Sequence, residues 1–422
     1  MLYYLVRPLA RLALKFFFTK IHLVNQDRVP QSDPVLMAIN HPTIFTEPIL
    51  MACYQSRALF FLAKGVLFIP PFVRLLKSLH LIPLFRKKDG GIEKRRGNLG
   101  SFDYCYKIFN KNGAVLIMPE GSSELVRQLR PFNKGFTKLA FGYYEKNKDT
   151  RLKILPVGVN FSDADKFRGE VSFGFGQPIE IQDYAELYQS SPRKATEKLM
   201  QDLYIEMEKQ VVHVKNPEDL FLVDQILRLI EHENPIDRTR VVVKNSDKID
   251  VEKRVTKIIE EMSIGSKEAL KTKTQSYFIQ LEQSNLSDYA LIHEERCQIG
   301  TLLFLILTHP IFLLGWVTNA LTYAFGLFCG SKAHDVETRM SVVMGMTFGF
   351  YLLYYPVAIL IGWMLGMWPL VLTILFPILG YFAVHYLDLA REYMAALKVR
   401  KSPQELINRL RDSRAEILKK FN

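Results

Sequence analysis

A histidine and a carboxylate lie six positions apart, directly after an apolar run. The run is Val35–Ile39, which we expect to form a buried strand, and His41 and Glu47 follow it. An imidazole can take a proton from a hydroxyl while a neighbouring acid holds its tautomer and stabilises the imidazolium. On this stretch alone, we favour a structural interpretation in which a capped helix carries an incidental histidine.

A second polar group follows the segment His80–Phe85, which we also predict to be a strand. Arg86 comes directly after this segment, and its planar fork can bind a phosphate through two hydrogen bonds. The cations that follow, up to Arg96, are typical of a solvated basic loop. Arg86 is therefore the candidate phosphate ligand, because it adjoins the strand.

The third group is a Pro-Glu-Gly-Ser-Ser turn after the predicted strand Ala114–Met118. Gly121 permits close backbone approach beside Glu120, and the free amides of such a turn can face a substrate oxygen. The alternative is a tight turn with a helix cap. Arg130 and Lys134 follow, just before an amphipathic segment, and add two further candidate cations.

Strand-like and helix-like segments alternate between residues 33 and 180. In addition to the strands named above, the pattern predicts strands at Ala58–Ala63 and Ile154–Asn160, and helices at Tyr104–Asn110 and Gly135–Tyr144. This alternation predicts an α/β domain, a mixed sheet flanked by helices, over residues 31–182. Residues 183–296 are rich in Glu and Lys, and we interpret them as a solvated, charged helical region without visible chemistry.

The C-terminal part is markedly apolar. Residues 302–328 contain no Asp, Glu, Lys or Arg, and neither do residues 340–387. A bilayer crossing needs about 20 apolar residues, so the first run suffices for one pass and the second for two, with a break near Met367–Pro369. We therefore predict a membrane region of two or three passes over residues 300–387. A purely soluble helical core is the less favoured alternative.

Two basic segments flank these regions. In residues 1–30, Arg7, Arg11 and Lys15 recur every four positions, which predicts a basic helix lying in the membrane interface. Packing of this helix on the protein's own domain is a compatible alternative. The tail, residues 388–422, has nine Lys and Arg against four acids from Arg391 onwards, which favours the cytoplasmic side. Three full crossings would place tail and N-terminal domain on opposite sides, so one segment could be re-entrant or merely embedded.

The bulk composition agrees with a membrane protein. The 422 residues carry a formal charge of +12 and are 49% apolar, which indicates contact with an anionic lipid surface before nucleic acid. No segment resembles a module that reads RNA or DNA. The four cysteines are scattered without C-x-x-C spacing, which argues against a structural zinc site or a disulfide framework.

Taken in order, four short blocks resemble those of the glycerolipid acyltransferase superfamily. The blocks are Asn40-His41 with Glu47-Pro48, Ile82-Pro83-Leu84-Phe85-Arg86, Met118-Pro119-Glu120-Gly121-Ser122, and Leu155-Pro156-Val157. Lys64 and Gly135 also fall where this family has a lysine and a glycine. The resemblance covers roughly Val35 to Pro178. It reverses the preference at His41, which we now expect to be catalytic.

The resemblance implies a role for each matching residue. His41 would be the base for the acceptor hydroxyl, with Glu47 orienting it, and Arg86 would contact the acceptor's phosphate. The remaining expected substrate-binding residues are Lys64, Glu120, Gly121, Ser122, Arg130 and Lys134. The acyl group would pass directly from acyl-CoA or acyl carrier protein, with neither a metal nor another cofactor. We expect a multi-pass membrane protein whose acyltransferase domain faces the cytoplasm.

Some positions depart from the family pattern. Five residues separate His41 from Glu47, where the common pattern has four and an aspartate. His80 stands where the second block usually begins with glycine, and Gly-Ser-Ser replaces Gly-Thr-Arg in the third block. The altered third block, together with the apolar C-terminal region that lysophosphatidate-type members usually lack, resembles the branch that acts on glycerol 3-phosphate or dihydroxyacetone phosphate and favours these acceptors. The alternatives are lysophosphatidate, another lysolipid or an amino-acid lipid, and a catalytically inactive membrane scaffold.

Overall fold

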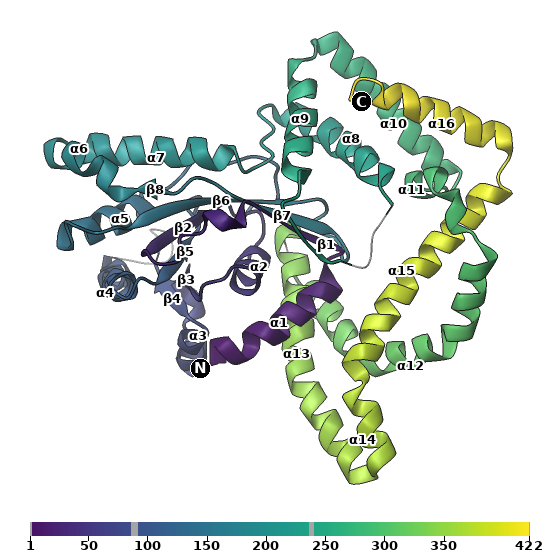
Figure 1. Cartoon of the computed structure of the whole chain (residues 1–422), viewed down its shortest axis with the longest axis horizontal. Helices are drawn as coiled ribbons and strands as arrows, with labels where there is room; N and C mark the ends of the chain where they lie inside the picture. Colours follow the sequence, from purple (N-terminus) through teal and green to yellow (C-terminus); the bar gives the residue numbers. More distant parts are fainter. Residues whose placement is uncertain (1, 86–91, 236–239, 334, 422) are drawn as a thin grey trace. The chain divides into compact units, whose positions relative to one another are not determined.

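The computed structural model describes residues 2–85, 92–235, 240–333 and 335–421 (Figure 1). Arg86 and the five residues after it lie outside the described residues. The chain divides into two compact units. The first consists of Met1–His213, Arg240–Ile249 and His334–Ser341, and the second of Val214–Thr239, Asp250–Ala333 and Val342–Asn422. The first unit thus takes in segments from far along the sequence.

The centre of the first unit is a mixed sheet of nine strands in the described residues, in the order β4-β3-β5-β2-β6-β7-β1-β9, with β8 paired to β6. The strands are β1 (Lys20–Val24), β2 (Val35–Ile39), β3 (Leu59–Lys64), β4 (Leu81–Leu84), β5 (Ala114–Ile117), β6 (Lys153–Phe161), β7 (Glu170–Phe175), β8 (Ile179–Glu180) and β9 (Val242–Lys244). Neighbouring strands are parallel except where β6 pairs with β7 and β8.

Helices cover both faces of this sheet (Figure 1). In the first unit they are α1 (Leu2–Phe17), α2 (Thr46–Tyr54), α3 (Val73–Ser78), α4 (Ile92–Phe109), α5 (Gly135–Lys146), α6 (Ala185–Ser190) and α7 (Pro192–Glu208). The main core lies between the sheet and α4, α5 and α7, where Leu36 and Ala38 of β2 meet Phe109, Phe136 and Leu203. Helices α1 and α2 pack against each other and lie on the opposite side of the sheet in Figure 1.

The central strand β2 explains why the sheet was visible in the sequence. Every residue of Val35–Ile39 is fully buried, because alternate side chains enter the layers above and below. Parallel strands covered on both faces read as continuous apolar runs. The carboxyl ends of β2, β3, β4 and β5 meet at one edge of the sheet, since these strands run in the same direction. The polar residues that follow them are therefore brought to one edge.

The prediction of a single helical segment over residues 1–30 is wrong in extent. Helix α1 ends at Phe17, and Lys20–Val24 forms β1, which is paired with β7 on one side and β9 on the other. Strand β9 itself lies within the region predicted to be wholly helical. These strands are short and receive their hydrogen bonds from partners more than a hundred residues away. Local periodicity carries no signal of such pairing.

The second unit is helical in the described residues. Its helices are α8 (Leu220–Glu233), α9 (Lys248–Glu261), α10 (Ile264–Gln283), α11 (Asp288–Ile292), α12 (Ile299–Gly330), α13 (Val336–Leu365), α14 (Met367–Ile374), α15 (Phe376–Lys401) and α16 (Gln404–Leu418), of which α9 and α13 begin in the first unit. The charged helices are less solvated than the sequence suggests. They share a core around Tyr277, and the buried Arg414 contacts Asp288 at 3.0 Å.

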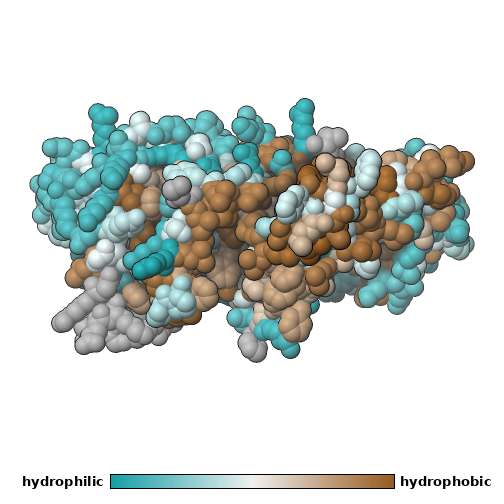
Figure 2. Space-filling view, turned by 90° about the horizontal axis from the view of Figure 1, so that it is seen from below, coloured by the Kyte–Doolittle hydropathy of each residue, from teal (hydrophilic) through white to brown (hydrophobic). Residues whose placement is uncertain are grey.

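Two helices of the described chain, α12 and Thr338–Leu365 of α13, are long and apolar enough to cross a membrane. The α14–α15 pair, bent by 50°, would make a third crossing if it is one span. Large apolar side chains are exposed along α12, among them Leu307 at 76% and Val317 at 64%. Figure 2 shows hydrophobic residues gathered across much of the face seen there. Such exposure suits a lipid environment.

The break between α13 and α14 falls at Gly366, one residue before the predicted position. Its φ of +117° is a conformation that L side chains rarely adopt, which explains why a glycine ends the helix here. The sequence indicated a helix break through Trp368 and Pro369, and in the structure the break lies two residues before Trp368, at Gly366.

An ion-pair cluster links the first residue of α9, Lys248, to strands β7 and β1 of the sheet. Lys248 Nζ lies 2.8 Å from Glu170 Oε2 on β7, and His22 Nε2 of β1 lies 3.2 Å from the same oxygen. Burial raises the pKa of the Glu170 carboxyl, but the hydrogen bond from His22 and the charge of Lys248 outweigh burial and lower this pKa from 4.5 to about 2. Glu170 therefore stays ionised and paired over a wide pH range.

Glu170→Gln should remove this pairing. Because the folded-state pKa is depressed, the stabilisation is fully present above pH 4.5 and is lost as the pH falls towards 2. At pH 7 we expect the unfolding free energy of the variant to be roughly 1–3 kcal/mol lower than that of the wild type. Below pH 4.5 this difference between the two proteins should become smaller. Denaturant unfolding in detergent at pH 7 and pH 3 measures both. The exposed Glu186→Gln is the control, and equal acid sensitivity of wild type and Glu170→Gln would contradict the assignment.

Candidate active site

Asn40 fixes the backbone where β2 leaves the sheet. Its Nδ2 donates to the carbonyl of Val159 at 3.0 Å, and the Val159 amide donates to Asn40 Oδ1 at 2.7 Å. The side chain thus continues the pairing between β2 and β6 by one residue after the strand has ended. His41 follows immediately, so its position is set by the sheet itself. The sequence offered this asparagine only as part of a block, without a role.

His41 and Glu47 form a hydrogen-bonded pair. His41 Nδ1 lies 2.5 Å from Glu47 Oε1, and 10% of the histidine side chain is exposed, whereas Glu47 is fully buried. Thr43 supplies the remaining contacts, since its hydroxyl donates to Oε2 and its amide to Oε1 at 3.3 Å. A buried carboxylate needs such partners to offset lost hydration. With Nδ1 turned to the acid, Nε2 is the nitrogen left for a substrate proton.

The structure also accounts for the unusual spacing. Glu47 is the second residue of α2, and Pro48 after it occupies the first turn, where a missing amide proton costs little. One additional residue between the histidine and the helix carries the acid's backbone further along. The longer glutamate side chain reaches back over this interval and makes the contact. The additional methylene of glutamate therefore compensates for the additional residue between the histidine and the helix.

The Pro-Glu-Gly turn lies directly beside His41. Gly121 has φ of +75°, and a Cβ there would come within 2.7 Å of Asn133 Nδ2, so both conformation and space favour glycine. Glu120 Oε2 accepts from the backbone amide of His41 at 3.0 Å. Its other oxygen accepts from the amide of Arg130 at 3.0 Å.

Arg130 completes this arrangement from the segment after the turn. Its Nη2 lies 2.6 Å from Glu120 Oε2 and 3.3 Å from the carbonyl of His41, and Nη1 donates to Ser122 Oγ at 3.0 Å. Only 2% of the Glu120 side chain is exposed. The substrate-binding roles expected of Glu120, Ser122 and Arg130 stay predictions, and the structure adds the contacts that these residues make within the protein. These residues are engaged with one another, and together they hold the backbone of His41 in place.

The other predicted site residues are distributed more widely. Lys64 is the last residue of β3 and is paired in register with Leu84 of β4, so it lies at the same edge of the sheet. Asn98 binds both the amide and the carbonyl of Phe85 and so fixes the backbone just before Arg86, whose own predicted role lies outside the described residues. Lys134 lines a separate pocket on the outer side of α5.

His80 departs from the family pattern in an instructive way. Its φ is +67°, which explains why a glycine is usual where β4 begins. The imidazole stacks between Tyr3 of α1 and Phe60 of β3, with ring centroids 4.2 Å from each. Burial lowers the pKa of His80, so the ring stays neutral near pH 7. The stacking offsets the backbone cost and ties α1 to the domain.

Comparisons with known proteins show similarity to acyltransferases. A family model described as Acyltransferase matches residues 20–160. Glycerol-3-phosphate O-acyltransferase 1 of Saccharomyces cerevisiae is 31% identical over 121 residues, which are 28% of this chain and 16% of that protein. Residues 20–160 are thus similar in sequence to acyltransferases, among them a glycerol-3-phosphate O-acyltransferase. Residues 20–160 include all four blocks and all of β6 except its last residue, Phe161.

Two further similarities extend beyond these residues. An uncharacterized acyltransferase of Schizosaccharomyces pombe is 22% identical over 323 residues, which are 68% of this chain and 47% of that protein. The crystal structure of PlsC, the lysophosphatidate acyltransferase of Thermotoga maritima, aligns with a TM-score of 0.34 and 15% identity over 49% of this chain and 80% of that one. The chain thus spans about half, or less, of the length of its curated relatives.

A contact that the sequence did not indicate joins the acyltransferase domain to the start of α13. The hydroxyls of Thr46 and Ser341 lie 2.9 Å apart, although 295 positions separate them in the chain. Both residues are buried, at 6% and 1% exposure. Thr46 begins α2 and directly precedes Glu47, so this hydrogen bond holds the helix turn that carries the acid. Nothing local marks either hydroxyl, because only the folded chain brings them together.

Loss of this contact should reduce turnover without weakening substrate binding. A single neutral hydrogen bond contributes about 1 kcal/mol, so Ser341→Ala and Thr46→Val should each lower kcat roughly fivefold with KM unchanged. The double variant should be no worse than either single one. Ser331→Ala is the matched control, because its hydroxyl donates to the carbonyl of Phe328, three residues before it in the chain. Equal turnover in all variants, or additive losses, would contradict the coupling.

Proposed function

We propose that this chain is a membrane-bound O-acyltransferase of phospholipid synthesis that moves a fatty acyl group from a thioester donor to a hydroxyl of glycerol 3-phosphate or dihydroxyacetone phosphate. The observation that carries the proposal is the His41–Glu47 hydrogen bond, at 2.5 Å, at the end of a buried parallel strand. The similarity to a yeast protein named glycerol-3-phosphate O-acyltransferase supports the choice of acceptor.

The reaction follows from the two ring nitrogens. His41 Nε2 removes the proton of the acceptor hydroxyl as its oxygen attacks the thioester carbonyl. Glu47, at Nδ1, stabilises the imidazolium that forms and keeps the ring in the required tautomer. The carbon–sulfur bond then breaks, and the departing thiolate recovers a proton from His41. The step needs neither an acyl-enzyme nor a metal.

We further propose that the protein is multi-pass and that its acyltransferase domain faces the cytoplasm. The apolar helices α12 and α13 support membrane insertion, and the basic tail supports the orientation. On α1, the side chains of Leu5 and Leu9 are 66% and 44% exposed, while Arg7 binds the carbonyl of Gln55. Helix α1 thus packs on its own domain through one face and leaves an apolar face for the bilayer interface.

His41→Ala should abolish acyl transfer, because removal of a general base typically costs about 10²–10⁴ in rate. Glu47→Gln should lower kcat while leaving KM close to the wild-type value, because the amide holds the ring but stabilises its cation poorly. The assay uses detergent-solubilised protein, labelled palmitoyl-CoA and four acceptors: glycerol 3-phosphate, dihydroxyacetone phosphate, lysophosphatidate and an amino-acid lipid. Membrane insertion of each variant is the control. Unchanged turnover of His41→Ala would favour the inactive scaffold.

A variant of Arg86 distinguishes acceptors that carry a phosphate from acceptors that do not. If Arg86 contacts the acceptor's phosphate, Arg86→Ala should raise KM for glycerol 3-phosphate by roughly 10–100-fold, since charge-assisted hydrogen bonds contribute about 1.5–3 kcal/mol. Lys111→Ala, a charge loss at an exposed position after α4, should leave this KM unchanged. A minor effect of Arg86→Ala with the best acceptor would indicate an acceptor without a phosphate.

A further inference from the structure

A pocket of about 430 Å³ lies between α5 and the segment from α6 to α7. One wall carries Lys134 and Lys138 from α5, and the opposite wall carries Arg193 from α7. Tyr188 stacks on Phe141 with centroids 4.2 Å apart, which gives the pocket an apolar aromatic side. The pocket thus combines three cations with a flat apolar surface.

The acidic groups at this pocket are already engaged. Glu145 accepts a hydrogen bond from the hydroxyl of Tyr188 at 2.7 Å, and Glu197 lies 2.9 Å from Arg193 Nε. The side chain of Arg193 is 86% exposed, so its remaining donors face solvent. The charged residues that line the pocket are therefore three cations, one of them ion-paired with Glu197, and the single acid Glu145.

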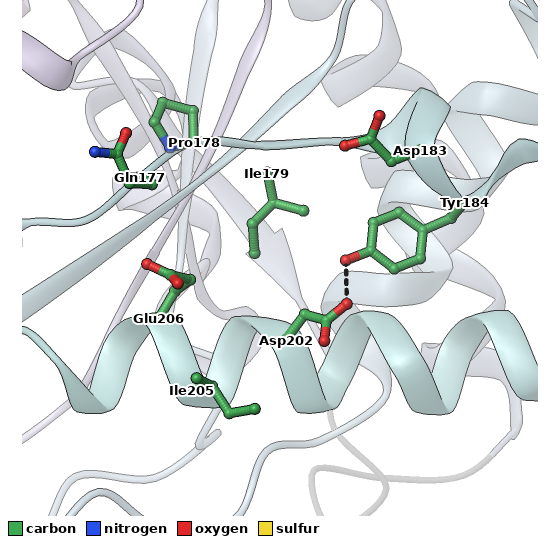
Figure 3. Close-up of a pocket in the computed structure, with 8 residues that line it drawn as sticks. All are labelled: Gln177, Pro178, Ile179, Asp183, Tyr184, Asp202, Ile205 and Glu206. Atoms are coloured by element: carbon green, nitrogen blue, oxygen red, sulfur yellow. Dashed lines mark hydrogen bonds between the residues drawn. The ribbon is translucent and has the colours of Figure 1, made fainter.

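A second pocket in the same unit provides a contrast. It lies beside α7 and is drawn in Figure 3. Its volume is about 300 Å³. Its charged lining residues are all acidic: Asp183, Asp202 and Glu206. Tyr184 donates to Asp202 at 2.6 Å, as the dashed line in Figure 3 marks. Phosphates would be repelled here, so of the two pockets only the one beside α5 suits an anionic ligand.

The pocket beside α5 is connected to the candidate active site by consecutive residues, Asn133 and Lys134. Asn133 Nδ2 donates to the carbonyl of Glu120 at 2.8 Å, and the Asn133 amide donates to the carbonyl of Pro119 at 2.7 Å. Lys134 is the next residue and caps α5. The residue that precedes this pocket's Lys134 is thus bonded to the turn that supports His41.

We propose that this pocket holds the adenosine 3′,5′-bisphosphate half of acyl-CoA, an inference that rests on the proposed acyl transfer. A purine with phosphates offers a flat apolar ring and several negative charges, which match the aromatic wall and the three cations. The pantetheine arm then runs over the start of α5 towards His41. The same assignment makes CoA, instead of acyl carrier protein, the donor.

The test compares two donors that differ only in the nucleotide. Lys138→Gln/Arg193→Gln should raise KM for palmitoyl-CoA about tenfold or more, while KM for palmitoyl-phosphopantetheine and both kcat values stay unchanged. The matched control is Lys194→Gln/Lys198→Gln, which removes the same charge from exposed positions of α7 that do not line the pocket. Equal changes for both donors, or a control that behaves like the test variant, would overturn the assignment.

Direct binding separates this inference from the proposed reaction. Calorimetry with adenosine 3′,5′-bisphosphate should show binding to wild type and to His41→Ala, and at least tenfold weaker binding to Lys138→Gln/Arg193→Gln. Two results together would overturn the assignment: the wild type does not bind the bisphosphate, and the double variant loses transfer from palmitoyl-carrier protein. The pocket would then dock a carrier protein. If bisphosphate binds but His41→Ala retains turnover, the reaction proposal fails and the nucleotide site stands.

Discussion

The burial of the Glu47 carboxylate is the constraint on which the site depends. A carboxylate without solvent contact is tolerated only with hydrogen-bond partners, and Glu47 has them in His41 and both donors of Thr43. These partners must be held at hydrogen-bonding distance, because a small displacement would leave a buried charge uncompensated. The chain meets this requirement by placing the histidine at a strand end and the acid in the first turn of the following helix.

A second buried pair supports the first. Glu120 and Arg130 bind each other and also contact the amide and carbonyl of His41, so the base is fixed through its backbone as well as its ring. The family resemblance suggested a substrate-binding role for the Glu-Gly turn. This chain lacks the arginine usual in the third block, and Arg130 binds the hydroxyl of Ser122 from eight residues further along. The site is therefore a set of interlocked polar groups at one edge of the sheet.

The architecture extends this support to distant segments. Strand β9 and the start of α13 both return to the first unit after the chain has left it, at Arg240 and at His334. The first return adds a strand next to β1, and the second brings Ser341 against Thr46. Ser341, in the second turn of the apolar helix α13, thus contacts the residue that directly precedes Glu47. Regions that seem separate in the sequence contribute directly to the acyltransferase domain.

The sequence by itself determined the buried strands, the order of the polar blocks, the choice of His41 and Glu47 as candidate residues, and the apolar C-terminal helices. These features depend on local periodicity and on residue types at short spacing, which remain visible without a fold. Only the tertiary structure decided that Lys20–Val24 and Val242–Lys244 are strands, that Glu120 supports His41, and that Thr46 meets Ser341. Each of these depends on a partner far away in the chain. Hydrogen bonds to distant partners leave no periodic trace in the sequence that makes them.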